Sequence, residues 1–307
     1  MDSKCFSSTH APLRERGVTL IELMVGIAIG LLTIAVALGA LIASRGVSGT
    51  TSDASQLQQQ ASYVFRVIGQ QARQAASIQL NLAIENAAPT DPITPEAAVA
   101  FTPDDKLYSS DGLTPPSTFP ISGKDAPASS EYKLSLAYQD YPEALFPAGA
   151  AASQFRDCLG QSAPAAAPTV VQSQFKLDTT QNELQCLGSG NPAPQAIARN
   201  VADFAVSYLV QDDLAAVRNG LPTVRIMNAA GVGANWQRVF GVEVCITLYG
   251  DEAISMPNGS TYLKCDGTTE NMSTTGTLGS NRKNRMHMTF RSVFQIRSQG
   301  QPTNPNA

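Results

Sequence analysis

Charge is scarce in this sequence, and neither sign is in large excess. Of its 307 residues 15% are charged, the formal net charge is −4 and the isoelectric point is about 5.2. Domains that bind nucleic acids are normally strongly basic, so this balance argues against a dedicated nucleic-acid binder. The acidic pairs lack the oxygen spacing of a calcium loop and are interpreted as solvated loop residues. These pairs are Asp104-Asp105, Asp212-Asp213 and Asp251-Glu252.

Histidine is scarcer still, and the residue patterns of common enzymes do not occur. The chain has two histidines, and we interpret His287 as an exposed residue on the polar side of a strand. The patterns H-E-x-x-H, G-x-S-x-G and G-x-x-x-x-G-K-S/T are missing from the sequence. The sequence therefore predicts no enzymatic activity, with no catalytic residue, no cofactor and no metal site.

Long apolar runs are also few, because only residues 18–43 could span a membrane. At 1.5 Å per residue this run is longer than a hydrocarbon core of about 30 Å. A secretory signal peptide has an apolar region of only about 7–15 residues and a small-residue cleavage site after it, which this run lacks. Lys4, Arg14 and Arg16 precede the run, and positive flanks stay in the cytoplasm. We expect the C-terminal bulk of the chain to be exported.

One carboxylate interrupts the apolar run. Glu22 is the only charged residue between Val18 and Ala43. An ionised carboxylate at the centre of a bilayer costs about 2.5–3.5 kcal/mol on insertion scales, and such residues are usually functional. Glu22 is therefore the first candidate for a functional residue.

Cysteine usage agrees with export. Cys5 lies in the basic leader, and four of the five cysteines follow the apolar run. An even number in an oxidising compartment suggests two disulfides, although four cysteines allow three pairings. Sequence proximity favours Cys158–Cys186 and Cys245–Cys265; buried free thiols are the alternative. Cys245 falls on the polar face of its strand, where it could hold an overlying loop that carries Cys265.

A long helix is expected from about Val18 to about Leu82. Its first half is apolar on all sides, whereas its second half has apolar residues at spacings of three and four, the pattern of an amphipathic helix packed on a domain. Gly46 and Gly49 are the places where it would bend or break. The apolar positions of the second half are Leu57, Ala61, Val64, Phe65, Ile68, Ala72 and Ala75.

Alternating apolar and polar residues predict antiparallel strands farther along the chain. The predicted fold class is α+β, with the long N-terminal helix packed on an antiparallel β-sheet of about five to seven strands. Two stretches rich in proline and alanine are expected to be long loops with little regular structure. The loops are residues 86–130 and 142–168, and the clearest strands lie within 132–138, 175–186, 203–210, 242–248 and 286–296.

The start of the apolar run resembles the type III signal of type IV prepilins. A short basic leader is followed by Gly17-Val18-Thr19-Leu20-Ile21-Glu22-Leu23 and an apolar helix. In that family a prepilin peptidase cuts after the glycine and methylates the new N-terminal amine. The resemblance implies cleavage between Gly17 and Val18 and N-methylation of Val18, although most members of the family have phenylalanine at that position.

The resemblance also implies how the apolar helix is used. In pilin filaments the equivalent glutamate pairs with the N-terminal amine of an adjacent subunit, so Val18 and Glu22 would set the register between helices, because an unpaired charge in apolar surroundings is costly. The Gly26–Gly30 spacing permits close helix approach, and Gly39 lies near the place where pilin helices are often locally melted. The glycines equally reflect the frequency of this residue in membrane helices.

Three distal stretches resemble the last strands of PilW-type minor pilins and occur in the same order. The resemblance implies a structural minor pilin in the tip or priming complex of a type IV pilus. Its partners would be other minor and major pilins, prepilin peptidase, the inner-membrane assembly machinery and a tip adhesin. The first alternative is a J-type pseudopilin of type II secretion, but Glu22 argues against the tip pseudopilin, which lacks this residue. The stretches are "RNVADFAVSYLVQDD", "NWQRVFGVEVCITLYG" and "MTFRSVFQIRSQG".

Two hypotheses from other classes stay open at this point. One is a signal-anchored periplasmic enzyme. The other is a DNA-uptake pilin that uses the basic C-terminal residues, although a solvated strand face or a subunit contact is the preferred interpretation of them. Those residues are Arg282, Lys283, Arg285, Arg291 and Arg297.

The expected organisation has four parts. The chain would be a single-pass protein of the inner membrane, with the leader in the cytoplasm and the C-terminal domain in the periplasm, before it enters a surface pilus. The parts are a cleaved leader (residues 1–17), a transmembrane and filament-core helix (18–45), the amphipathic second half of the helix (46–85) and a β-rich globular domain (86–307).

Overall fold

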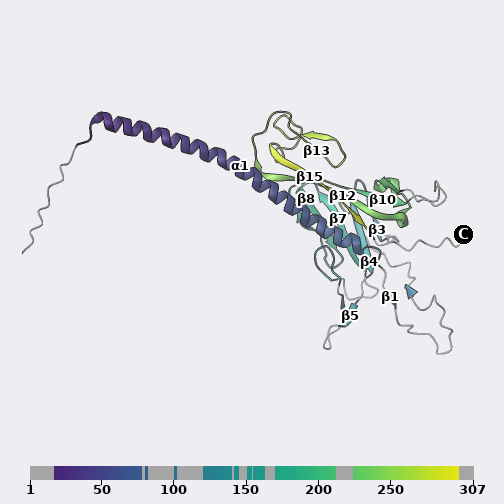
Figure 1. Ribbon diagram of the computed structural model, residues 1–307. Helices are drawn as coiled ribbons and strands as arrows, with labels where there is room; N and C mark the ends of the chain where they lie inside the picture. Colours follow the sequence, from purple (N-terminus) through teal and green to yellow (C-terminus); the bar gives the residue numbers. More distant parts are fainter. Residues whose placement is uncertain are drawn as a thin grey trace, which may run out of the picture. The chain divides into compact units, whose positions relative to one another are not determined.

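The chain forms two compact units, which meet between Gly49 and Thr50. Both units are drawn in Figure 1. The predicted leader lies outside the described residues, apart from Gly17. The computed structural model describes residues 17–77, 80–81, 100–101, 120–139, 142–144, 151–153, 155–162, 170–211 and 224–296.

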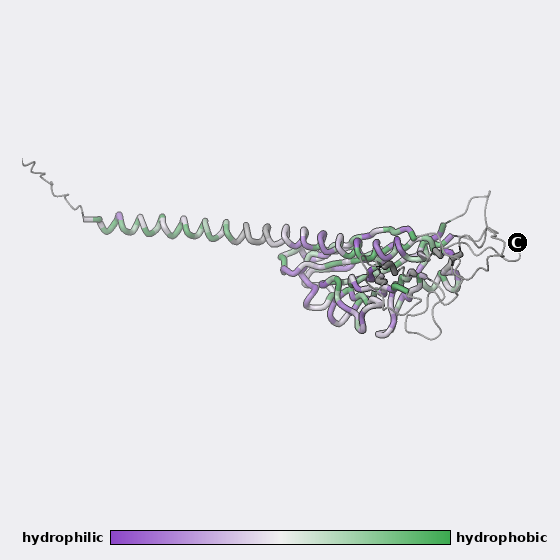
Figure 2. The backbone as a smooth tube through the Cα atoms, turned by 90° about the horizontal axis from the view of Figure 1, so that it is seen from below, coloured by the Kyte–Doolittle hydropathy of each residue, from purple (hydrophilic) through white to green (hydrophobic). Residues whose placement is uncertain are grey.

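The first unit is the N-terminal part of helix α1, which as a whole spans Leu20–Gln74. Its large apolar side chains are exposed on every side, from Val18 at 70% to Leu41 at 49%. Figure 2 shows this apolar stretch along the start of the helix. Within the described part of its own unit the helix therefore has no core to pack on.

The second unit contains the amphipathic part of α1, which is predicted correctly by its periodicity. Leu57, Ala61, Val64, Ile68 and Ala72 are all at most 3% exposed. They pack in one core with residues from two antiparallel sheets, so the predicted α+β class is confirmed.

The helix ends earlier than the sequence predicts. The last helical residue is Gln74 rather than Leu82, so the extension to residue 85 is wrong. Ala76 has φ +65°, a left-handed conformation that commonly ends helices. Its N–H donates to the Ala137 carbonyl at 3.1 Å, so the chain leaves the helix and joins a strand.

The first main sheet has four strands in the order β11-β10-β12-β15. All neighbours are antiparallel, and Val206 of β10 lies opposite Val244 of β12. The predicted alternation is present, because Val242, Val244, Ile246 and Leu248 are fully buried. The strands are β10 (Val201–Gln211), β11 (Val224–Met227), β12 (Val239–Ala253) and β15 (Arg285–Gln295).

The second main sheet has five strands in the order β3-β4-β7-β8-β9. The sequence predicts one sheet and does not separate these strands from the others. Leu134, Phe175 and Leu184 of this sheet are fully buried and join the same core. The strands are β3 (Ile121–Ser122), β4 (Leu134–Gln139), β7 (Val170–Asp178), β8 (Glu183–Gly188) and β9 (Gln195–Ala198).

The remaining elements are short. Residues 229–232 form α2 (Ala229–Val232), and residues 236–238 form a 3-10 turn, η3 (Trp236–Arg238). Three antiparallel pairs complete the described structure. They are β1 (Leu80–Asn81) with β2 (Ala100–Phe101), β5 (Pro142–Ala144) with β6 (Ala151–Ser153), and β13 (Thr261–Leu263) with β14 (Thr269–Asn271).

The two expected loops contain more structure than their composition suggests. Ile121 is fully buried and pairs with Leu136, so the end of the first stretch belongs to the domain. In the second stretch Pro142 pairs with Ser153, and Asp157 is 3% exposed. For these residues the prediction of loops with little regular structure is wrong, because contacts distant in sequence hold them; the rest lies outside the described residues.

Candidate processing and assembly site

The predicted cleavage site lies just ahead of the first turn of α1. Gly17, Val18 and Thr19 are not helical. The Glu22 N–H donates to Thr19 Oγ1 at 3.3 Å, and the Leu23 N–H donates to the Thr19 carbonyl at 3.1 Å. Thr19 therefore caps the helix, and the Gly17–Val18 bond precedes it. This role was not predicted, although residues 19–22 have the T-x-x-E pattern of a capping box.

Glu22 is exposed and lies in the first turn of the helix. The partial positive charge of a helix N-terminus stabilises a carboxylate there by about 0.3–1 kcal/mol at an exposed site. Its place at one end of the apolar run puts the single negative charge near the amine that cleavage at Gly17 would create.

The three glycines of the apolar run have open surroundings. A Cβ atom added at Gly26, Gly30 or Gly39 would meet no atom within 4 Å. Nothing in this chain's described structure therefore requires glycine at these positions. The segment Leu20–Leu41, 22 residues long, is long and apolar enough to cross a membrane.

Both disulfides that sequence proximity favours are present in the structure. Cys158 is bonded to Cys186 and Cys245 to Cys265, at sequence separations of 28 and 20. The first attaches the loop before β7 to β8. Beside it the buried Asp157 carboxylate accepts hydrogen bonds from the Leu159, Gln161 and Gly190 N–H groups, each at 2.9–3.1 Å.

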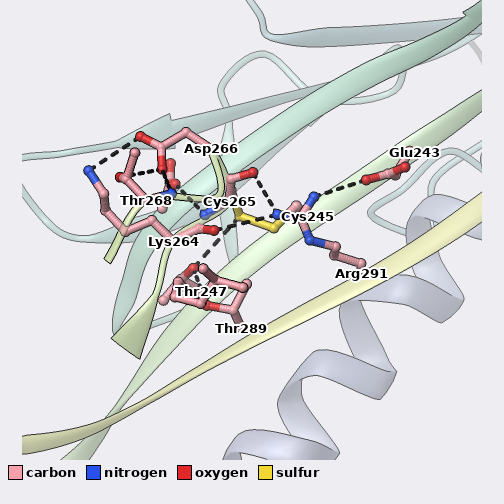
Figure 3. The surroundings of a disulfide bond; sticks show 11 residues. Glu243, Cys245, Thr247, Lys264, Cys265, Asp266, Thr268, Thr289 and Arg291 are labelled. Carbon is pink, nitrogen blue, oxygen red and sulfur yellow. Dashed lines mark hydrogen bonds and ion pairs between the residues drawn. A yellow bond between two sulfur atoms is a disulfide. The ribbon is translucent and has the colours of Figure 1, made fainter. Parts of the chain in front are cut away.

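The second disulfide holds a flap, which we define as residues 254–284 between β12 and β15. Figure 3 shows Cys265 of the flap bonded to Cys245 of β12. The Arg291 guanidinium donates to the Cys265 carbonyl at 2.7 Å and forms an ion pair with Glu243 at 3.0 Å. Thr289 Oγ1 donates to the Leu263 carbonyl at 2.5 Å. The flap is thus fixed to the polar face of the four-stranded sheet by covalent and hydrogen bonds.

His287 is buried under this flap, so its interpretation as an exposed residue is wrong. Its side chain is 7% exposed, and its ring stacks on Tyr262 with centroids 4.3 Å apart. The ring contacts the Arg285 carbonyl through Nδ1 at 2.9 Å, and the buried Nε2 has no partner among the described residues. Burial, opposed by the Arg285 hydrogen bond and reinforced by the Arg282 charge, lowers the pKa of His287 to about 4.

The basic residues near the C-terminus are engaged within the domain. Arg282 donates to the Ala202 carbonyl, Lys283 to the Thr274 carbonyl and Arg285 to the Gly250 carbonyl. Arg291 is described above, and Arg297 lies outside the described residues. These contacts favour a structural role for the four described residues over contact with DNA.

The acidic pairs do not form a cation site in the described structure. Asp251 accepts a hydrogen bond from the Asn200 side chain, and no group of three or more ligand residues occurs in the described part of the chain. Asp104-Asp105 and Asp212-Asp213 lie outside the described residues.

Two buried polar residues for which no role was predicted anchor the second half of α1. Asp53 is 4% exposed and accepts the Glu252 N–H at 3.1 Å. Gln71, 2% exposed, donates to the Arg156 carbonyl at 3.0 Å and accepts from the Ser173 hydroxyl at 3.0 Å. In the sequence these two residues appear only as polar positions next to the apolar stripe of the helix. Exposed polar positions of the helix have the same appearance, so the sequence does not show that Asp53 and Gln71 are buried.

Comparison with known proteins identifies the N-terminal element. Residues 12–43 match the family model described as the prokaryotic N-terminal methylation motif. The chain matches no curated protein. A type IV-like pilin from Thermus thermophilus is similar at 14% identity over 58% of this chain and 82% of its own, with a TM-score of 0.28. That likeness is too weak to support an inference.

The N-terminal motif and the arrangement of helix and sheets indicate the same class of protein. The N-methylation motif implies processing by a prepilin peptidase in the context of pilus assembly. It includes the start of a long helix whose second half packs on antiparallel sheets. In its N-terminal motif the chain is therefore similar to type IV prepilins, and its N-terminal helix fits insertion in the inner membrane followed by entry into a pilus.

Proposed function

We propose that this chain is a structural minor pilin of a type IV pilus and that it acts in the tip or priming complex that starts assembly. The observation that carries the proposal is the apolar helix with one carboxylate at its start, which lies within the match to the N-methylation motif at residues 12–43. Each feature alone would fit other membrane-anchored proteins. Together they fit a subunit that is cut, methylated and assembled through its helix.

Physical chemistry supports two successive environments for this helix. Large apolar side chains such as Leu20, Ile21 and Leu32 are 66–75% exposed, and apolar surface left in water costs about 25 cal/mol per Å². The membrane would cover this surface before assembly, and neighbouring helices of other minor and major pilins would cover it afterwards. Cleavage after Gly17 would create the amine that pairs with Glu22 of a neighbour.

The glycines fit the same proposal. Without side chains at Gly26 and Gly30, a partner helix can approach closely, and this chain offers no internal contact that explains them. In lipid, helix association depends on such packing because the tails are as apolar as the side chains. The charge pair would then supply the register that apolar contacts leave open.

The tip or priming role rests on the distal strands. The three stretches that resemble PilW-type minor pilins fall on β10, β12 and β15, which are consecutive neighbours in one sheet. A tip adhesin and the inner-membrane assembly machinery would be further partners. A J-type pseudopilin would share the processed helix and differ in where the mature chain is found.

The deciding experiment is mass spectrometry of the N-terminal peptide from sheared surface filaments and from membranes. We expect N-methyl-Val18 in filaments, in amounts well below those of the major subunit. Processed Val18 confined to membranes would favour the pseudopilin, and an intact Met1 leader in both fractions would refute the proposal. A Glu22→Gln chain is the matched control, because it leaves Gly17 and Val18 unchanged and removes only the charge.

A further inference from the structure

A small cavity lies on the face of the five-stranded sheet that is turned away from the core. Its volume is about 200 Å³, and its lining comes from β3, β4, β7, the β3–β4 loop and η3. Three of the lining residues, Ser122, Ser135 and Gln174, lie opposite one another on adjacent strands. Their neighbours Ile121 and Leu134 face the core instead, so the cavity floor is a polar row across three strands.

This floor is polar although it is buried. Ser135 is 6% exposed and Gln174 is 4% exposed. The Ser135 hydroxyl oxygen accepts from the side-chain amides of Gln172 at 3.1 Å and Gln174 at 3.4 Å. The Gln174 carbonyl oxygen accepts no hydrogen bond from the described residues, so it is available to a ligand in the cavity. A polar floor of this kind favours a ligand that can exchange hydrogen bonds with it.

The walls are aromatic and the rim is electrically balanced. Tyr132 and Trp236 line the cavity, and Trp236 is held edge to face against Tyr208 with centroids 4.9 Å apart. Lys124 and Glu131 form an ion pair that also lines it. The Lys124 hydrogen bond and the Ala128 N–H lower the pKa of Glu131, so its carboxylate is charged. The rim therefore carries no net charge.

These features select the class of ligand. A purely apolar molecule would leave each buried polar group unsatisfied, at about 1–3 kcal/mol, and an ion would meet a charge of its own sign at Lys124 or Glu131. A hydroxyl-rich molecule with apolar C–H faces satisfies the floor and packs on the two aromatic walls. The volume is below the roughly 300–1,000 Å³ of sites for drug-sized ligands, so the cavity takes a single ring.

We propose that this cavity binds one neutral pyranose unit of a glycan, whose hydroxyl groups hydrogen-bond to Ser122, Ser135 and Gln174 and whose ring face packs against Trp236. The proposal does not depend on processing or on pilus assembly. It gives the exported domain a contact with carbohydrate that is separate from the N-terminal helix.

The chain supplies its own reporter, because Trp236 is its only tryptophan. Full-length protein in a polyoxyethylene detergent, which carries no sugar headgroup, would be titrated with the methyl pyranosides of glucose, galactose and mannose and with N-acetylglucosamine. We expect a saturable change in tryptophan fluorescence with at least one of them, with Kd in roughly the millimolar range for a ligand this small. Glycerol at equal concentration should give no saturation.

Variants locate the binding. Ser122→Ala and Gln174→Met should each weaken binding about fivefold, the value of one hydrogen bond, whereas Ser129→Ala, outside the cavity lining, should not. Near-ultraviolet circular dichroism checks that each variant folds. If Gln174→Met does not fold, the binding measured with Ser122→Ala tests the proposal. The proposal is overturned if none of the four sugars gives saturation, or if saturation survives unchanged in the cavity variants.

Discussion

Acid should destabilise the exported domain through His287, and the size of the effect follows from its burial. The pKa of His287 is lowered from 6.5 to about 4, mainly because the flap keeps water from the ring. The folded state therefore holds the ring neutral, while the unfolded chain takes up a proton as the pH falls below 6.5. The free energy of unfolding should be unaffected by this group at higher pH, fall between pH 6.5 and 4, and level off below that.

The expected loss can be isolated with a variant that does not titrate. A shift of 2.5 units, from 6.5 to 4, corresponds to about 3 kcal/mol in total, of which roughly 2.5 kcal/mol is lost by about pH 4.5. His287→Phe retains an aromatic ring against Tyr262 and cannot take up a proton. Carboxylates such as Asp266, whose pKa is also lowered, to about 2, titrate in both proteins and cancel in the comparison.

The measurement is urea unfolding of the full-length chain in detergent, followed by near-ultraviolet circular dichroism at about pH 7.5 and 4.5. The wild type should lose about 2.5 kcal/mol more than His287→Phe between the two. Equal losses would refute the argument that the flap keeps this ring neutral. Tyr262→Ala gives an independent check, because it uncovers the ring and should move the NMR titration of His287 toward 6.5.

Three further predictions follow from the same structure. Replacing both Cys245 and Cys265 by Ser opens a loop with a sequence separation of 20, and should cost about 3 kcal/mol; unchanged hydrogen exchange in the flap would contradict this. Gln71→Leu removes one of the two donors to the Arg156 carbonyl and the acceptor of the Ser173 hydroxyl, and should cost about 2–3 kcal/mol, whereas the exposed neighbour changed as Gln70→Leu should stay within about 0.5 kcal/mol in the same unfolding assay. Glu22→Gln should leave cleavage at Gly17 intact and reduce recovery in sheared filaments, and normal recovery would argue against the charge pair.

The apolar faces could be predicted because periodicity is local. The spacing of Leu57, Ala61, Val64 and Ile68 marks one side of a helix, and each is buried. The alternation around Ile246 marks one side of a strand in the same way. A pattern of this kind shows which residues face a core, whichever element of the fold supplies the other side.

The partner of each strand and the segments that cover the sheets could not be predicted, because both depend on contacts distant in sequence. Alternation does not distinguish one sheet from two, since Phe175 and Phe204 have the same pattern and lie in different sheets. His287 alternates as an exposed residue would, and only the flap attached through Cys265 buries it. The helix ends at Gln74 because the Ala76 N–H donates to the Ala137 carbonyl, a residue distant in sequence, and not to a carbonyl of the helix.

The candidate site divides in the same way. The order of Gly17, Val18 and Glu22 is a local motif, and residues 12–43 match its family model. Cleavage, methylation and the pairing of charges stay predictions, because they involve a peptidase and a second subunit. Thr19 could have been assigned as the cap from the T-x-x-E pattern alone.

The second half of α1 needs polar contacts because its apolar stripe does not fix its position along the sheets. A stripe that repeats with the helical turn would bury similar area after a shift of one turn, about 5.4 Å. Asp53 accepts the Glu252 N–H near one end, and Gln71 bonds the Arg156 carbonyl near the other. Between them Gly69 leaves room for the Phe294 ring, which an added Cβ would meet at 2.5 Å. A shifted helix would bury Asp53 and Gln71 without partners and place a side chain against Phe294. These three positions, rather than the stripe, therefore select one register.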